Sequence, residues 1–127
     1  MNSNEIDDKI KKKVLNFQKN EITESIIYNK ISKAEKDPKN KKILKKISED
    51  EFEHYNSWKK YTHEDVASSK FNIWKYFFIS KLFGITFAIK LMEKGEEQAQ
   101  QTYEEISKSI PEAKKLWKMK KITKMNW

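Results

Sequence analysis

Residues 48–54 read Ser-Glu-Asp-Glu-Phe-Glu-His, and this stretch decides how the rest of the chain is interpreted. Glu51 and His54 stand three positions apart, so on a helix their side chains share one face. The other positions of that face, spaced alternately three and four residues apart, are Leu44, Ile47, Trp58 and Tyr61. The stretch therefore predicts a core-facing helix over residues 39–62 whose apolar seam is interrupted by an acid and an imidazole.

Two other predicted helices have an apolar seam that is interrupted about midway. They cover residues 5–35 and 70–109, and Pro111 marks the end of the second one or the start of another helix. In antiparallel helices of similar length, the interruptions would lie at one level of the bundle. The interrupting acids are Glu21 and Glu24 in the first helix, and Glu96, with Glu93 one turn before it, in the second.

Acids at one level of a helical core need a positive partner. A single acid on an apolar seam is better explained by a side chain that reaches solvent. That explanation does not account for three helices whose seams are interrupted at the same level. A buried carboxylate without a partner costs several kcal/mol or takes up a proton. Because no lysine falls on these three seams near the acids, we expect a metal ion. Carboxylates with imidazole, in a chain without cysteine, suit iron, with manganese or zinc as alternatives.

The composition sets the fold class. The chain has 127 residues, with only two Gly and two Pro, which favours long helices joined by few turns. We expect an all-α antiparallel bundle of three full helices and a short basic fourth segment. The expected boundaries are one domain over residues 1–115 and a basic C-terminal tail over residues 116–127.

A faint internal repeat adds an expectation about the tail. Glu21 precedes Tyr28 by seven residues, and Glu96 precedes Tyr103 by the same spacing. The first copy continues to the Glu-x-x-His motif, whereas the second runs into the Lys-rich tail. The tail can also be read in a shifted frame, in which the third base of each codon is joined to the first two bases of the next codon. From Trp117 onward, this shifted frame can encode Glu-Asp-Glu-Glu-Asn-His. We therefore expect the tail to be a frameshifted or truncated version of a fourth ligand-bearing helix, with a natural short form as the alternative.

The net charge of +8 comes from Lys alone. Because the excess of Lys is concentrated in the tail, the alternative function is a basic helical interaction module that binds an anionic membrane or nucleic acid there. The chain lacks Arg, the residue best suited to reading bases, so we expect no nucleic-acid partner. The apolar stretch 71–92 is interrupted by Lys75, Lys81 and Lys90, which predicts a helix buried in the bundle and a cytoplasmic protein, with a membrane-surface helix as the minor alternative.

Residues 20–32, 48–62 and 82–106 resemble the rubrerythrin-like branch of the ferritin-like superfamily, in particular domains fused to vacuolar-iron-transporter-like membrane proteins. The resemblance implies a four-helix bundle that binds two irons and acts as a ferroxidase- or peroxidase-like oxidoreductase. It also implies a link to a transporter domain that this chain does not contain. The implied ligands are Glu21, Glu51, His54, Glu93 and Glu96, with Glu51 bridging. The fourth-helix ligands are missing, so we expect an incomplete site that a homodimer could complete.

Overall fold

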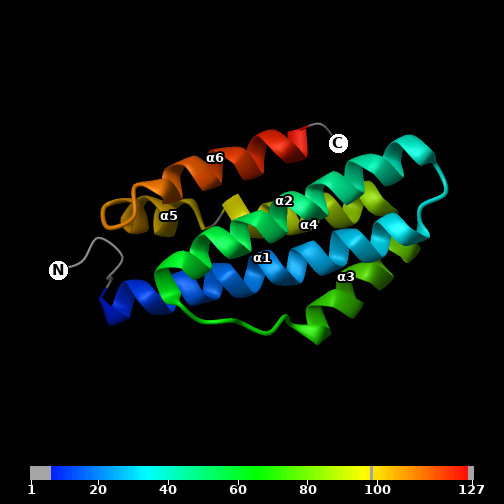
Figure 1. Cartoon of the computed structure of the whole chain (residues 1–127). Coiled ribbons are helices and arrows are strands. Elements are labelled where there is room, and N and C mark those ends of the chain that lie inside the picture. Colours follow the sequence, from blue (N-terminus) through cyan, green and yellow to red (C-terminus); the bar gives the residue numbers. More distant parts are fainter. Residues whose placement is uncertain (1–6, 98, 126–127) are drawn as a thin grey trace.

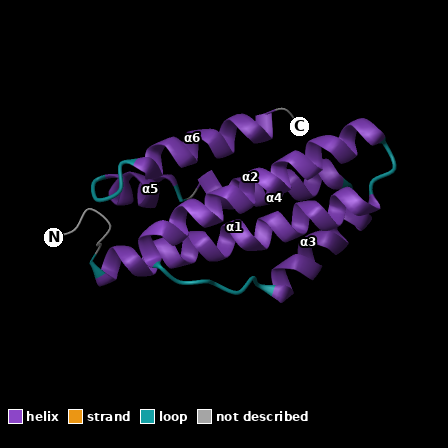
Figure 2. Cartoon of the chain, in the orientation of Figure 1, coloured by secondary structure: helices purple, strands orange, loops and turns teal. Residues whose placement is uncertain are grey.

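The computed structural model describes residues 7–97 and 99–125, and this part of the chain contains helices, turns and connections but no strand (Figures 1 and 2). The helices are α1 (Asp8–Ala34), α2 (Pro38–Thr62), α3 (Lys70–Phe83), α4 (Ile85–Glu97), α5 (Gln100–Ser107) and α6 (Glu112–Met125). The all-α prediction is therefore confirmed for the described residues.

Helix α2 begins within one residue of its predicted start, whereas α1 begins three residues after its predicted start. The Asp7 side chain accepts a hydrogen bond from the Ile10 backbone N–H at 2.8 Å, and Asp37 caps α2 just before Pro38. The two helices run antiparallel and in contact (Figure 1). Ser25 and Ser48 hold them at close range, because each hydroxyl donates to the other residue's carbonyl, at 2.8 and 2.7 Å.

The prediction of one helix over residues 70–109 is wrong, because the segment forms three helices. Gly84 caps α3 with a φ of 96°, a conformation that costs glycine little. The chain reverses there, and α4 runs back along the bundle in contact with α3 (Figure 1). The segment divides again between α4 and α5, so a seam drawn through all three helices does not describe one face.

The connection over residues 63–69 leads from the end of α2 back along α1 to the start of α3 (Figure 2). The Tyr55 hydroxyl donates to Asp65 at 3.0 Å and accepts from the Val66 backbone N–H at 2.9 Å. The Ser69 backbone N–H donates to the Thr23 hydroxyl of α1 at 2.9 Å. These bonds fix the entry to α3.

The C-terminal segment is helical and packs on the bundle. Helix α6 begins after Pro111, crosses the expected domain boundary after residue 115, and lies against α2 and α5. The Tyr61 hydroxyl of α2 donates to Glu112 at 2.8 Å, and burial together with this carboxylate raises the pKa of Tyr61 to about 12. Residues 116–125 thus belong to a fourteen-residue helix rather than to a short segment beside the bundle.

The described core consists of two apolar clusters. One joins α1 and α2 to α5 and α6, and the other joins α1 and α2 to α3 and α4. A layer of polar side chains separates them. The first cluster is Val14, Phe17, Trp58, Tyr103, Ile106, Ile110, Ala113 and Leu116, and the second is Ile27, Tyr28, Ile31, Leu44, Ile47, Ile73, Ile89 and Met92.

The apolar stretch 71–92 is buried along one face only. Ile73 and Ser80 of α3 and Ala88 and Ile89 of α4 are buried. The opposite side of α3 faces outward, which contradicts the prediction that the whole stretch packs inside the bundle. Among the described residues, no helix combines the length and the hydrophobicity needed to cross a bilayer.

Candidate metal centre

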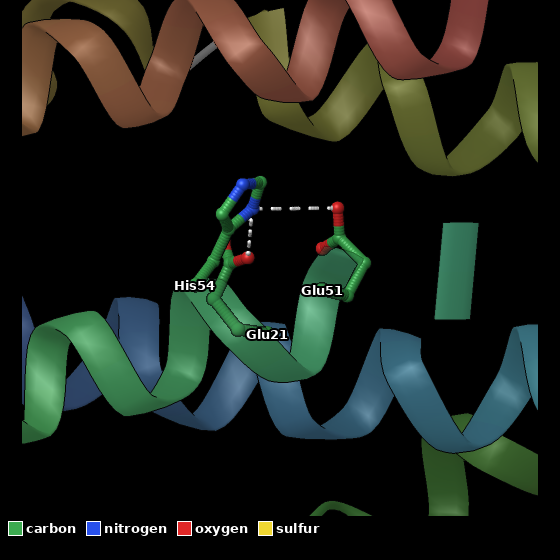
Figure 3. Close-up of side chains that lie close together, drawn as sticks. All are labelled: Glu21, Glu51 and His54. Atoms are coloured by element: carbon green, nitrogen blue, oxygen red, sulfur yellow. Dashed lines mark hydrogen bonds and ion pairs between the residues drawn. The ribbon is translucent and has the colours of Figure 1, made fainter. Parts of the chain in front are cut away.

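The polar layer contains three residues that the sequence analysis selected. Glu21 projects from α1, and Glu51 and His54 project from neighbouring turns of α2 (Figure 3). All three are buried, and each offers a ligand atom within 4.8 Å of those of the other two. This group could hold a metal ion.

His54 links the two carboxylates. Its Nδ1 lies 3.2 Å from Glu21 Oε2 and 3.8 Å from Glu51 Oε1 (Figure 3). An ionised carboxylate can only accept a hydrogen bond, so the Nδ1 carries a proton in this arrangement. A metal ion bound at Nδ1 would take the place of that hydrogen bond.

Lys120 of α6 is the residue that the sequence analysis missed. Its buried Nζ lies 2.5 Å from Glu21 Oε1, 3.2 Å from Glu24 Oε2 and 3.5 Å from Glu51 Oε2. The three seams carry no lysine near these acids, but a lysine reaches them from another helix, so a metal ion is not the only cation that can meet their charge. The ammonium group supplies the positive charge that the carboxylates require, in the position where a metal ion was expected.

The sequence contains a signal for this position. Ile110, Ala113, Leu116 and Lys120 follow one another at intervals of three, three and four residues, and all four are buried. Lys120 therefore continues the apolar face of α6. A lysine can occupy such a position because its four methylene groups pack like an apolar side chain while the ammonium group reaches a polar partner.

The neighbours of Glu21 favour its ionised form. Burial alone would raise the pKa of Glu21, but the Lys120 ammonium group and then His54 outweigh that effect and hold the pKa at about 2. Three carboxyl groups, those of Glu21, Glu24 and Glu51, face one ammonium group. The acids thus outnumber the fixed positive charge, which favours an additional proton or a cation of higher charge.

The other predicted ligands have different positions. Glu24 is buried one turn after Glu21 on α1 and contacts Lys120. Glu93 is half-buried on α4 and is absent from the three-residue group. The side chain of Glu96 lies outside the described residues, so its predicted convergence with the cluster stays a prediction.

A cavity of about 200 Å³ adjoins the cluster and has Glu24 and Lys120 in its lining. Its described wall comes from α1, α3, α4 and α5 as well as α6. Gly95 and Ala99, which flank residues 96–98, also line it. The cavity offers water or a small ion a place beside the carboxylates.

No protein-family model matches the chain, and no curated protein or solved structure matches it either. The class of the protein rests on its fold and its cluster: it is a helical protein with a buried carboxylate–histidine group that could hold a metal ion.

Proposed function

We propose that the protein binds iron through Glu21, Glu51 and His54 in a ferritin-like helical bundle. The observation that carries the proposal is the convergence of these three buried ligand groups from two adjacent helices. Two carboxylates and an imidazole without sulfur form a donor set that suits iron, and manganese and zinc are the competing metals. A ferritin-like bundle uses single glutamates and Glu-x-x-His motifs from facing helices in this way.

The path of the chain supports the ferritin-like assignment. Helices α1 and α2 form an antiparallel pair, and the connection along the bundle leads into α3, which is followed by α4, α5 and the returning helix α6 (Figure 1). In this scheme α4 and α6 take the places of the third and fourth bundle helices, although α4 packs against α3, and α6 packs against α5 and α2. Lys120 then stands on the helix from which the family's second Glu-x-x-His would project.

Lys120 determines how a metal ion enters. Its Nζ already contacts Glu21, Glu24 and Glu51, so an ion bound by the same oxygens has to displace it. A divalent ion offsets more of the negative charge than one ammonium group does, and the long lysine side chain can rotate toward the adjoining cavity. Iron binding and burial of the Lys120 ammonium group are therefore alternatives in this proposal.

The chemistry of such a site is limited by its ligands. Bound iron would supply one-electron redox chemistry with oxygen or peroxide. Glu21 and Glu51 would balance the rise in charge when ferrous iron is oxidised, and His54 would complete the donor set. With Lys120 in place of a fourth-helix ligand, we expect one metal ion per chain and a weak ferroxidase- or peroxidase-like activity.

The test is anaerobic titration of the purified protein with ferrous iron, alongside manganese and zinc. Glu51→Gln should weaken iron binding at least about tenfold, because it removes a charged ligand while keeping the side-chain volume. Glu53→Gln is the matched control, because Glu53 lies two residues away on the exposed side of α2. Equal affinity for the two variants, or no saturable binding by the parent protein, would refute the proposal.

The proposed partners follow from the same resemblance. Iron ions come first, followed by an iron-transporter-like membrane domain and a second copy of the chain that completes the site. The alternative of a basic tail that binds an anionic partner is weaker, because α6 directs Leu116 and Lys120 into the bundle. Four other lysines of this helix are exposed and would have to carry that function: Lys114, Lys115, Lys118 and Lys121.

A further inference from the structure

Helix α3 has a continuous apolar face that points away from the bundle. Four residues at intervals of three, four and four positions share this face, and each is at least half exposed. Ile73 and Ser80 lie on the opposite side and are buried. The residues of this outer face are Phe71 (76% exposed), Trp74 (50%), Phe78 (56%) and Leu82 (76%).

The apolar exposure continues past the turn at Gly84. Phe83 and Phe87 are 66% and 51% exposed, and their ring centroids lie 5.4 Å apart. The exposed rings of the outer face also contact one another, since the ring centroids of Trp74 and Phe78 lie 6.0 Å apart. Large exposed apolar areas of this kind mark a surface that is covered by a partner.

The charged residues within residues 70–92 all have one sign. Lys70, Lys75 and Lys81 are exposed on α3, and the segment from residue 70 to residue 92 contains no acid. Lys30 of α1 adds a fourth positive charge, with its Nζ 4.4 Å from the centroid of the Trp74 ring. On a helical projection, Lys75 flanks the apolar face on one side, and Lys70 and Lys81 flank it on the other.

We propose that the outer face of α3 docks on the surface of an anionic lipid bilayer. Phe71, Trp74, Phe78 and Leu82 enter the boundary between headgroups and acyl chains, and the flanking lysines contact anionic headgroups. The arrangement of aromatic and aliphatic residues on one face with lysines at its edges is typical of helices that lie in the membrane interface. The protein thus binds at the surface through one short helix.

The charge pattern selects lipid over a second copy of the chain. In a two-fold symmetric dimer through this face, the lysines of one α3 would meet those of the other, because the same patch serves both partners. No acid within residues 70–92 could offset that repulsion. An anionic bilayer offers the opposite charge together with an apolar layer of matching depth.

The experiment is co-sedimentation of the full chain with phosphatidylcholine vesicles that contain or lack phosphatidylserine. We expect binding only to the anionic vesicles and a loss of about tenfold for Phe78→Asp/Leu82→Asp, because both substitutions place charge on the inserted face. Phe52→Asp is the matched control, since Phe52 is 42% exposed on α2. Circular dichroism of each variant establishes that it is folded.

A second pair of variants separates α3 from the C-terminal lysines. Lys75→Gln/Lys81→Gln should weaken anionic binding about tenfold, whereas Lys118→Gln/Lys121→Gln should leave it unchanged. The proposal is overturned if the second pair alone matters, or if the parent chain fails to bind anionic vesicles. It is equally overturned if Phe78→Asp/Leu82→Asp dissolves a dimer in sedimentation equilibrium while vesicle binding is absent.

Discussion

The Nζ of Lys120 lies 2.5 Å from Glu21 Oε1, although 99 positions separate the two residues in the sequence. The contact joins the first helix of the bundle to the sixth, and both side chains are buried. In this arrangement the ammonium group of Lys120 offsets part of the carboxylate charge.

Lys120→Met should destabilise the metal-free protein and strengthen metal binding. Methionine keeps most of the side-chain volume but leaves Glu21, Glu24 and Glu51 without the ammonium group. Removal of one partner from a buried ion pair costs about 3–5 kcal/mol of unfolding free energy. Urea unfolding without metal measures the loss, and calorimetric titration with ferrous iron measures the gain. Lys118→Met is the control, because Lys118 is exposed on the same helix. A weaker affinity for iron in Lys120→Met would show that Lys120 assists the metal.

Acid should destabilise the protein through Glu21. Its pKa is about 2 in the folded protein against an ordinary value of 4.5. A lowered folded-state pKa contributes stability that is complete above the unfolded pKa and is lost as the pH falls from about 4.5 through about 2. The contribution is about 3 kcal/mol at neutral pH, and Lys120 is its main source. Unfolding free energies measured between pH 6 and pH 2 should fall less steeply in Glu21→Gln. An identical slope in both proteins would contradict this origin.

Glu51→Gln should change metal-free stability by less than about 1 kcal/mol while it weakens iron binding. Lys120 keeps Glu21 and Glu24 as partners in this variant, and the mutual repulsion of three carboxyl groups is reduced. Thermal melts with and without iron measure the two effects separately. A loss of several kcal/mol without metal would identify Glu51 as a structural hydrogen-bonding residue.

Lys120→Glu should make folding depend on metal. The variant places a fourth carboxyl group beside Glu21, Glu24 and Glu51, so the metal-free bundle should unfold at a lower temperature than that of Lys120→Met. With a divalent ion bound, the added carboxylate becomes a ligand and the order should reverse. Melting curves over a series of iron concentrations test this. If the melting temperature of Lys120→Glu does not change with iron concentration, residue 120 does not occupy a ligand position.

The sequence predicts α1, α2 and their buried polar residues well for a physical reason. Each helix has one apolar seam and a capping acid, and the two are neighbours in the chain, so their facing residues follow from helix periodicity. Glu21, Glu51 and His54 therefore meet as the spacing indicates, within 4.8 Å.

Helices α3 to α6 and the position of Lys120 could not be predicted from helix periodicity. Residues 71–92 are apolar on several faces, so periodicity does not indicate which face is buried, and Phe78 and Leu82 are exposed. The reversal at Gly84 depends on a backbone conformation that periodicity does not indicate. Lys120 was missed because its charge suggested a solvated tail, whereas the carboxylates of two distant helices make its burial favourable.

The polar layer between the two apolar clusters has a consequence for how the bundle opens. Helices α5 and α6 contribute to one cluster, α3 and α4 contribute to the other, and only α1 and α2 belong to both. Each outer helix pair can therefore detach as a separate cooperative unit while the opposite cluster stays intact. In native-state hydrogen exchange, amides of α5 and α6 should share one opening free energy and those of α3 and α4 another. The slowest amides should lie in α1 and α2, which exchange only when the whole molecule unfolds.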